Sequence, residues 1–367
     1  MLGVDILNNA KKRDLFLGGN TSKGFYNLFD NLISQEEANR IVCLKGGPGT
    51  GKSSLMKKVG FHFLTEGYDV ELFHCSSDDQ SLDGVLVKGL NVAIVDGTAP
   101  HIVDPINPGA VDNVVNLADG LDSDSISKNK KEIMGYAAEI GDCFKRAYTY
   151  FGACKHLYED WIHLNELTLD ENSIDKFTES LKNMILPIAK ISNLGKERHL
   201  FATAFTPNGI VSYTKNIAES VTTKYIIKGE PGLYKNTVLR NLGRLSQTYG
   251  YNVEYFHNPL IPSKLEHIII PELGVGVFSR NELSKVDLDG TIYNMEDFCD
   301  KTMLKSLNDE IEFNKIELDI LLNKGLSLIT KAKLIHDELE KFYVSNMDFN
   351  LVNDYYSKIV SKFESYK

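Results

Sequence analysis

One glycine-rich segment occurs twice in this chain, once intact and once altered. The first copy reads Gly46-Gly47-Pro48-Gly49-Thr50-Gly51-Lys52-Ser53 and is followed by Ser54; the second reads Gly229-Glu230-Pro231-Gly232-Leu233-Tyr234-Lys235-Asn236. The first copy fits the phosphate-binding pattern G-x-x-x-x-G-K-[ST], whose backbone N–H groups surround a polyphosphate at the start of a helix. An apolar run at 41–44 predicts the strand before the loop, and apolar spacing over 53–64 predicts the helix after it.

The repeat extends well beyond this segment. When 45–96 is aligned without gaps to 228–279, 16 of the 52 pairs are identical, against about three expected from ordinary composition. A repeat of this length indicates a duplicated domain rather than a solenoid unit. We therefore expect two domains of α/β class. Residues 1–195 form a P-loop NTPase domain with an intact loop, and 196–367 form a degenerate one, each with a parallel sheet and a helical extension.

Long helical patterns follow the strands in both halves. Apolar residues recur every three or four positions from 125 to 188 and again from 307 to 363, as one face of a helix requires. Most of these stripes are interpreted as core. A second interpretation, left open, is that the two helical hairpins pack together as a homo-oligomer or partner surface. The turn at 193–195 is the expected boundary between the halves.

The intact copy assigns roles to three side chains. Lys52 is expected to reach the β and γ phosphates of ATP or GTP, and the Ser53 hydroxyl to bind Mg²⁺. Asp96 ends the apolar strand predicted at 91–96, so its carboxylate is expected to hold Mg²⁺ or a water bound to it. Nucleotide contacts are assigned to 46–54 as a whole.

Comparison of the copies predicts which one works. Gly51 becomes Tyr234, which replaces a residue free to adopt positive φ with a bulky ring. Ser53 becomes Asn236 and Asp96 becomes Ser279, which removes both expected Mg²⁺ ligands. We therefore expect an active N-terminal site and a degenerate C-terminal one, in which Lys235 binds an anion weakly at most.

Other polar residues are weaker candidates for catalysis. Asp78 and Asp79 lie in a connector predicted at 76–81, after the second strand, and either one is a candidate to position an attacking water or to accept a proton. A helix cap or a solvated turn explains them equally well. His101 is a candidate sensor of the γ phosphate, although a lone histidine is as often structural.

Composition excludes several classes. The net charge of −10 argues against broad electrostatic binding to nucleic acid. The five cysteines show no C-x-x-C spacing, so neither a disulfide framework nor a zinc site is predicted. No run reaches the length of a membrane span and 1–12 lacks the apolar core of a secretory signal, which predicts a cytoplasmic protein without membrane contact.

Three segments resemble a known family: 18–25, 46–54 and 96–105 are similar to an uncharacterised group of tandem P-loop ATPase-like proteins from Gram-positive, often spore-forming bacteria. The likeness covers nearly the whole chain and implies cytoplasmic ATP or GTP binding. It implies no established substrate.

The residues after Asp96 decide the ranking of functions. ATPases of the AAA type usually place Glu directly after this Asp, whereas Gly97 stands here, so we expect a slow or partner-stimulated Mg²⁺-dependent hydrolase. A small-molecule or nucleotide kinase is the first alternative, because 96–101 loosely resembles a kinase signature but lacks its arginine. The second alternative is a non-catalytic, nucleotide-gated regulatory protein.

Overall fold

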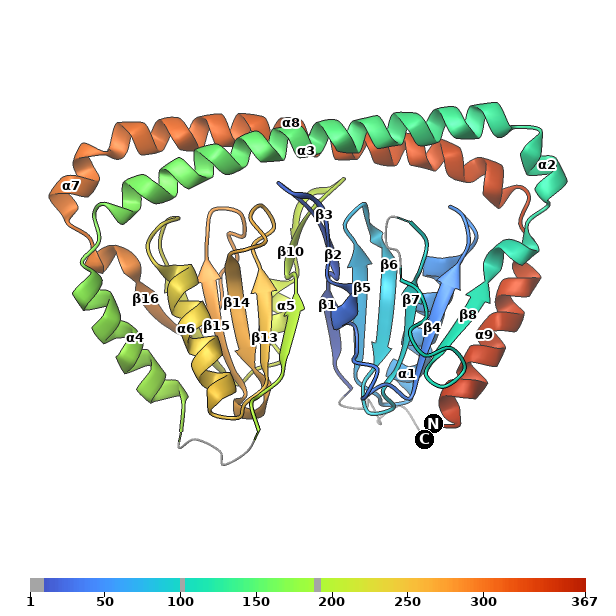
Figure 1. Cartoon of the computed structure of the whole chain (residues 1–367), viewed down its shortest axis with the longest axis horizontal. Helices are drawn as coiled ribbons and strands as arrows, with labels where there is room; N and C mark the ends of the chain where they lie inside the picture. Colours follow the sequence, from blue (N-terminus) through green and yellow to red (C-terminus); the bar gives the residue numbers. More distant parts are fainter. Residues whose placement is uncertain (1–9, 100–102, 188–192) are drawn as a thin grey trace, which may run out of the picture. The chain divides into compact units, whose positions relative to one another are not determined.

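The computed structural model describes residues 10–99, 103–187 and 193–367 of the chain. These residues form two compact units (Figure 1). The N-terminal unit combines residues up to 18 with 27–145 and 328–367, and the C-terminal unit combines 19–26 with 146–327. Each unit contains a six-stranded sheet with helices packed against it.

The sheet of the N-terminal unit is mixed rather than parallel, so the expectation of a parallel sheet is wrong. Its strand order is β1-β5-β6-β7-β4-β8. β4 pairs in parallel with β7 and β8, and β1 with β5, but β6 runs antiparallel to both of its neighbours. The strands are β1 (Lys12–Leu15), β4 (Arg40–Lys45), β5 (Val70–Cys75), β6 (Asp78–Val87), β7 (Val92–Asp96) and β8 (Asp112–Asn116).

β6 explains this difference. Its first residues, 78–81, are polar, so they read as part of a connector, yet the chain reverses directly after Cys75 and returns as a strand beside β5. Its second half, 82–87, is buried in the sheet. The order of the strands along the chain was therefore predicted, but this tight reversal was not.

The sheet of the C-terminal unit repeats the same plan. Read from the other edge, its order is β9-β13-β14-β15-β12-β16, with β14 antiparallel to β13 and β15. This matches the N-terminal sheet strand for strand and supports a duplicated layout. The strands are β9 (Glu197–Leu200), β12 (Thr223–Lys228), β13 (Val253–His257), β14 (Leu265–Ile270), β15 (Val275–Arg280) and β16 (Thr291–Asn294).

Two short hairpins accompany the sheets, and helices fill the rest of the described chain. The hairpins pair β2 (Gly18–Thr21) with β3 (Gly24–Asn27) and β10 (Thr203–Thr206) with β11 (Gly209–Ser212). The helices after the two loops, α1 and α6, each have 14 residues. The helices are α1 (Lys52–Thr65), α2 (Ser123–Ser127), α3 (Lys130–Glu166), α4 (Glu171–Ile185), α5 (Thr214–Ala218), α6 (Lys235–Thr248), α7 (Lys301–Ser306), α8 (Asn308–Val344) and α9 (Phe349–Glu364).

The compact units do not coincide with the two halves of the sequence, because the halves exchange helices. α9 packs against α1, and α4 packs against α6. In the N-terminal unit, Val352, Ile359 and Phe363 of α9 are buried in one core with Phe63 of α1. In the C-terminal unit, Ile174 and other residues of α4 lie in the core of the second sheet. Each sheet is thus covered by a helix encoded in the other half.

The membrane prediction has one structural test. Within the described residues, no helix is both long and apolar enough to cross a bilayer. This agrees with the expected lack of membrane contact.

Candidate phosphate-binding site

The loop 46–51 joins the end of β4 to the start of α1, so the strand and helix that the motif requires are both present. Gly49 and Gly51 adopt φ values of 68° and 90°, which favour glycine over residues with a side chain. Gly51 directly precedes the first helical residue, Lys52. The loop therefore directs backbone N–H groups and the positive end of the α1 dipole to one place, an arrangement that suits an anion.

Lys52 lies across the loop. Its Nζ donates to the carbonyl oxygens of Gly46 (2.7 Å) and Gly47 (2.8 Å) and lies 3.6 Å from Asp96 Oδ2. The lysine and the aspartate that the sequence selected independently are therefore brought together. The Lys52 and Asp96 side chains are both mostly buried, which strengthens their interaction relative to a pair in water.

Asp96 and Ser53 are held by backbone groups. Asp96 ends β7, and its Oδ1 accepts from the Thr98 N–H (2.8 Å), while the Thr98 hydroxyl donates to Gly46 O (2.9 Å). Ser53 Oγ accepts from the Leu82 N–H of β6 (3.0 Å). This bond leaves the other Ser53 lone pair available as an acceptor for a cation.

The connector residues lie differently from the expectation. Asp78 Oδ2 accepts from the Ser81 hydroxyl (2.8 Å) and forms an ion pair with Lys333 of α8 (3.3 Å). Asp79 is buried, and its Oδ2 accepts from the Gln80 amide (3.2 Å). None of these contacts joins either carboxylate to Lys52 or Asp96. His101 lies outside the described residues.

The end of α8 packs on the loop, which sequence reasoning did not predict. A Cβ placed on Gly47 would lie 3.0 Å from the Tyr343 ring, and one on Gly49 would lie 2.8 Å from Val344 Cγ2. Glycine at both positions therefore allows α8 to approach closely. No local pattern could have revealed this contact, because the helix lies almost 300 residues away in the chain.

Lys45 is a second residue that sequence reasoning missed. Its Nζ donates to Gly97 O (2.7 Å), Val103 O (3.2 Å) and Asp104 Oδ1 (3.0 Å), so it fixes the chain after Asp96. A signal was present, because Lys45 matches Lys228 in the repeat. The repeat was interpreted for differences between the copies rather than for shared cations.

The altered loop keeps the fold of the first without its polar groups. Tyr234 stands at Gly51's position with φ 55°, an uncommon value for a bulky residue. Asn236 Oδ1 accepts from the Leu265 N–H (2.8 Å), as Ser53 Oγ does from Leu82. The asparagine thus preserves the hydrogen bond of the lost serine. Lys235 donates to Gly229 O, and burial lowers its pKa although nearby glutamates oppose this.

Side chains and α3 fill the space at the altered loop. Glu230, which replaces Gly47, accepts from the Trp161 indole N–H (3.1 Å) and from Lys315 Nζ (2.6 Å). A Cβ on Gly232 would lie 2.4 Å from the Ile162 carbonyl oxygen. Only about 60 Å³ of free volume remains beside Lys235, and this is too small for a triphosphate. These features support a degenerate second loop.

A buried histidine makes the C-terminal unit sensitive to acid. His267 Nδ1 accepts from the Ser279 N–H (3.2 Å), so Nε2 carries the proton and donates to Thr214 Oγ1 (2.9 Å). Burial lowers the pKa of His267 to about 3. Below pH 6.5 the unfolded chain therefore binds a proton that the folded chain refuses until about pH 3, so stability falls as the pH falls through this window.

Replacement of this histidine should reduce that dependence. From pH 6.5 to 4.5, the free energy of unfolding should fall by about 2–3 kcal/mol more in the native protein than in His267→Gln, measured by urea denaturation. The exposed His156 of α3 provides the control, since His156→Gln should leave the pH dependence unchanged. Burial raises the pKa of Glu266 to about 7, which acts in the opposite direction in all three proteins. Parallel pH curves for native protein and His267→Gln would contradict this assignment.

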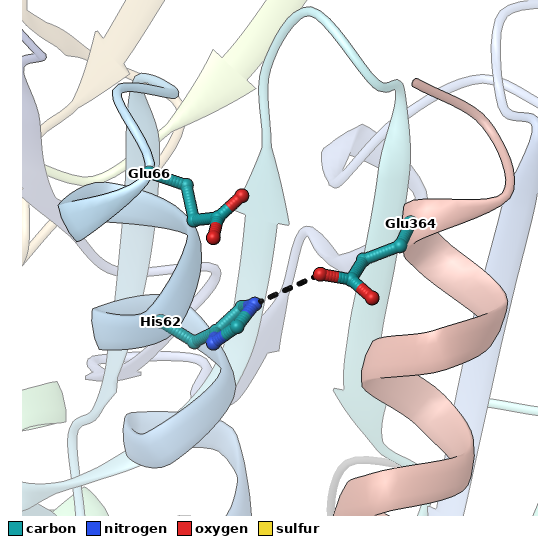
Figure 2. Close-up of side chains that lie close together, drawn as sticks. All are labelled: His62, Glu66 and Glu364. Carbon is teal, nitrogen blue, oxygen red and sulfur yellow. Dashed lines mark ion pairs between the residues drawn. The ribbon is translucent and has the colours of Figure 1, made fainter.

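Two groups of histidine and carboxylate side chains in the described residues could, by distance alone, hold a metal ion. Figure 2 shows the first, His62 and Glu66 of α1 with Glu364 of α9. Lys367 already pairs with Glu66 (2.5 Å) and Glu364 (3.2 Å), and His62 lies 3.5 Å from Glu364. The group is therefore better explained as an ion-pair network that joins α9 to α1. The second group, on α8, contains Asp337, which already pairs with Lys333.

Comparison with known proteins adds one likeness. Residues 26–88 match the family model "Nephrocystin 3, N-terminal". The matched segment contains β4, the loop and α1. Neither a curated protein nor a solved structure matches the chain.

Proposed function

We propose that the protein binds ATP or GTP with Mg²⁺ at the loop 46–54 and hydrolyses it slowly or on stimulation by a partner. The observation that carries the proposal is the convergence of Lys52 and Asp96, 3.6 Å apart, at a glycine loop between a strand and a helix. The family-model match spans this loop, and the sequence resemblance to tandem P-loop ATPase-like proteins points the same way.

The residues present suit a nucleotide and its metal. Lys52 is tied only to loop carbonyls and Asp96, so an incoming phosphate would replace these contacts with a stronger charge-assisted one. The Ser53 hydroxyl and the Asp96 carboxylate are the oxygen donors that would hold Mg²⁺. Bound there, the metal would neutralise phosphate charge. Lys52 and the loop N–H groups would orient the polyphosphate.

Asp96→Asn tests the metal assignment. The native protein should be stabilised more by ATP with Mg²⁺ than by ATP with EDTA, and Asp96→Asn should remove most of that difference because the amide is a poorer cation ligand. Thermal unfolding of the full chain measures both. Asp124→Asn, at an exposed position in α2, should behave as the native protein does. An unchanged Mg²⁺ effect in Asp96→Asn would remove Asp96 from the metal site.

The reaction is tested separately with labelled ATP. Release of labelled phosphate without an acceptor supports a hydrolase, whereas transfer of the label to an added metabolite supports a kinase. Abolition of phosphate release by Lys52→Ala shows that the activity belongs to this loop.

One observation favours a nucleotide-gated regulatory protein as a second candidate. α8 contacts the loop through Tyr343 and Val344 and pairs with Asp78 through Lys333. A nucleotide that alters the loop would therefore alter the packing of α8. Tight binding without turnover, together with a nucleotide-dependent change in hydrogen exchange over 333–344, would support this candidate.

A further inference from the structure

The C-terminal unit contains a cavity that nucleotide binding at the first loop does not use. Its volume is about 870 Å³. It lies at the carboxyl ends of β12 and β15, beside the altered loop, and residues 315–326 of α8 form another wall. In open α/β sheets ligands bind at the carboxyl ends of strands, and sites for small organic molecules occupy roughly 300–1,000 Å³. The cavity has the position and size of such a site.

Glu282 gives the cavity its most specific chemistry. It follows β15 and lines the wall, and both of its carboxylate oxygens are buried without a hydrogen bond from any described residue. Tyr158 and Lys235 lie near enough to respond to its charge. A buried acceptor without a donor costs free energy, so this carboxylate is well suited to receive a donor from a ligand, above all a protonated amine.

Cationic side chains lie at the strand ends. Lys228 and Arg280 end β12 and β15 and are register partners across the sheet. Lys228 is exposed and forms no ion pair with a described residue, and Arg280 pairs with the highly exposed Asp287 (2.7 Å). Lys315, in contrast, is engaged with Glu230 and Glu312. Lys228 and Arg280 are thus the cations available to an anionic group.

The remaining wall is apolar and includes Trp161, Leu318 and Leu322. We propose that the cavity binds a small zwitterion, with its primary amine on Glu282 and its carboxylate or phosphate between Lys228 and Arg280. Free amino acids and aminoalkyl phosphates share this chemistry. The proposal does not depend on nucleotide binding, because all of its residues belong to the C-terminal unit.

Trp161 offers a direct measurement, since it is the chain's single tryptophan. The full chain is titrated with each of the standard amino acids and with phosphoethanolamine, while its fluorescence and the heat of binding are recorded. At least one probe should bind, and its N-acetylated form, which lacks the charged amine, should bind at least about ten-fold more weakly. Binding by no probe, or equal binding of the acetylated form, would overturn the proposal. The responding set separates the carboxylate source from the phosphate source.

Glu282→Gln identifies the site. It should weaken binding of the responding probe at least about ten-fold while leaving the melting temperature unchanged or raised, because it removes a buried charge without a partner. Glu219→Gln, at an exposed glutamate of the same unit, should change neither. Unaltered affinity in Glu282→Gln would refute the assignment, and so would a lowered melting temperature, which would mark the glutamate as structural.

A second variant and a second background keep the test independent of the nucleotide site. Lys228→Gln, at an exposed position, should also weaken binding; full affinity in this variant would refute the assigned orientation. Lys52→Ala should retain the zwitterion response. Failure of nucleotide binding would therefore be distinguishable from failure of this cavity.

Discussion

Lys52→Ala should abolish the stabilisation of this protein by Mg-ATP. At about 100 times its dissociation constant, a ligand that binds only the folded state raises the free energy of unfolding by roughly 3 kcal/mol. Lys52 is the only side chain whose ammonium lies on the carbonyl oxygens of Gly46 and Gly47 among the described contacts. Its removal leaves the phosphates without their principal cation. Chemical denaturation with and without Mg-ATP measures the increment directly.

Lys235→Ala is the matched control from the second copy. Lys235 is buried, so its truncation should lower the stability of the protein without ligand. The increment caused by Mg-ATP should nevertheless stay near its native value, because Tyr234 and Glu230 occupy the altered loop. Equal losses of the increment in the two variants would contradict the assignment of one working and one degenerate loop.

Phe363→Ala, in the last helix, should destabilise the N-terminal unit. Phe363 is fully buried, and its ring centroid lies 6.1 Å from that of Phe63 in α1. Truncation of a buried phenylalanine typically costs about 3–5 kcal/mol, because it loses apolar burial and leaves a cavity. Hydrogen exchange should therefore accelerate in α1 and β4, although both lie some 300 residues before the substitution.

Phe313→Ala controls for the loss of an aromatic side chain from a helix. Phe313 lies on α8 and is 58% exposed, so its truncation should change stability by less than about 1 kcal/mol. If Phe363→Ala left exchange in α1 and β4 at the native rate, the packing of α9 on the first sheet would be wrong.

Local patterns predicted the elements around the loop well, because their causes are local. The apolar run before Gly46 and the helical spacing after Lys52 follow from the periods of strands and helices. Asp96 was placed correctly at the end of its strand for the same reason. The antiparallel strand β6 was missed because Asp78 to Ser81 are polar, and nothing local distinguishes such a segment from a loop.

Long-range packing could not be predicted in the same way. The stripes on α4 and α9 showed that one face of each helix is buried, but a stripe does not specify which sheet covers it. The cavity in the C-terminal unit was missed for a related reason. Trp161, Lys228 and Glu282 come from three segments that only the folded chain brings together.

The exchange of helices between the halves has a consequence for how the protein unfolds. Two six-stranded sheets would ordinarily be expected to melt independently, as separate domains often do. Here, loss of the C-terminal sheet would release the start of α8 and the chain leading to α9, and loss of the N-terminal sheet would release the start of α3 and the chain leading to α4. Each melting event would strip the surviving sheet of its covering helix. The exchange therefore makes the chain a single cooperative unit, with one thermal transition shared by both of its sheets.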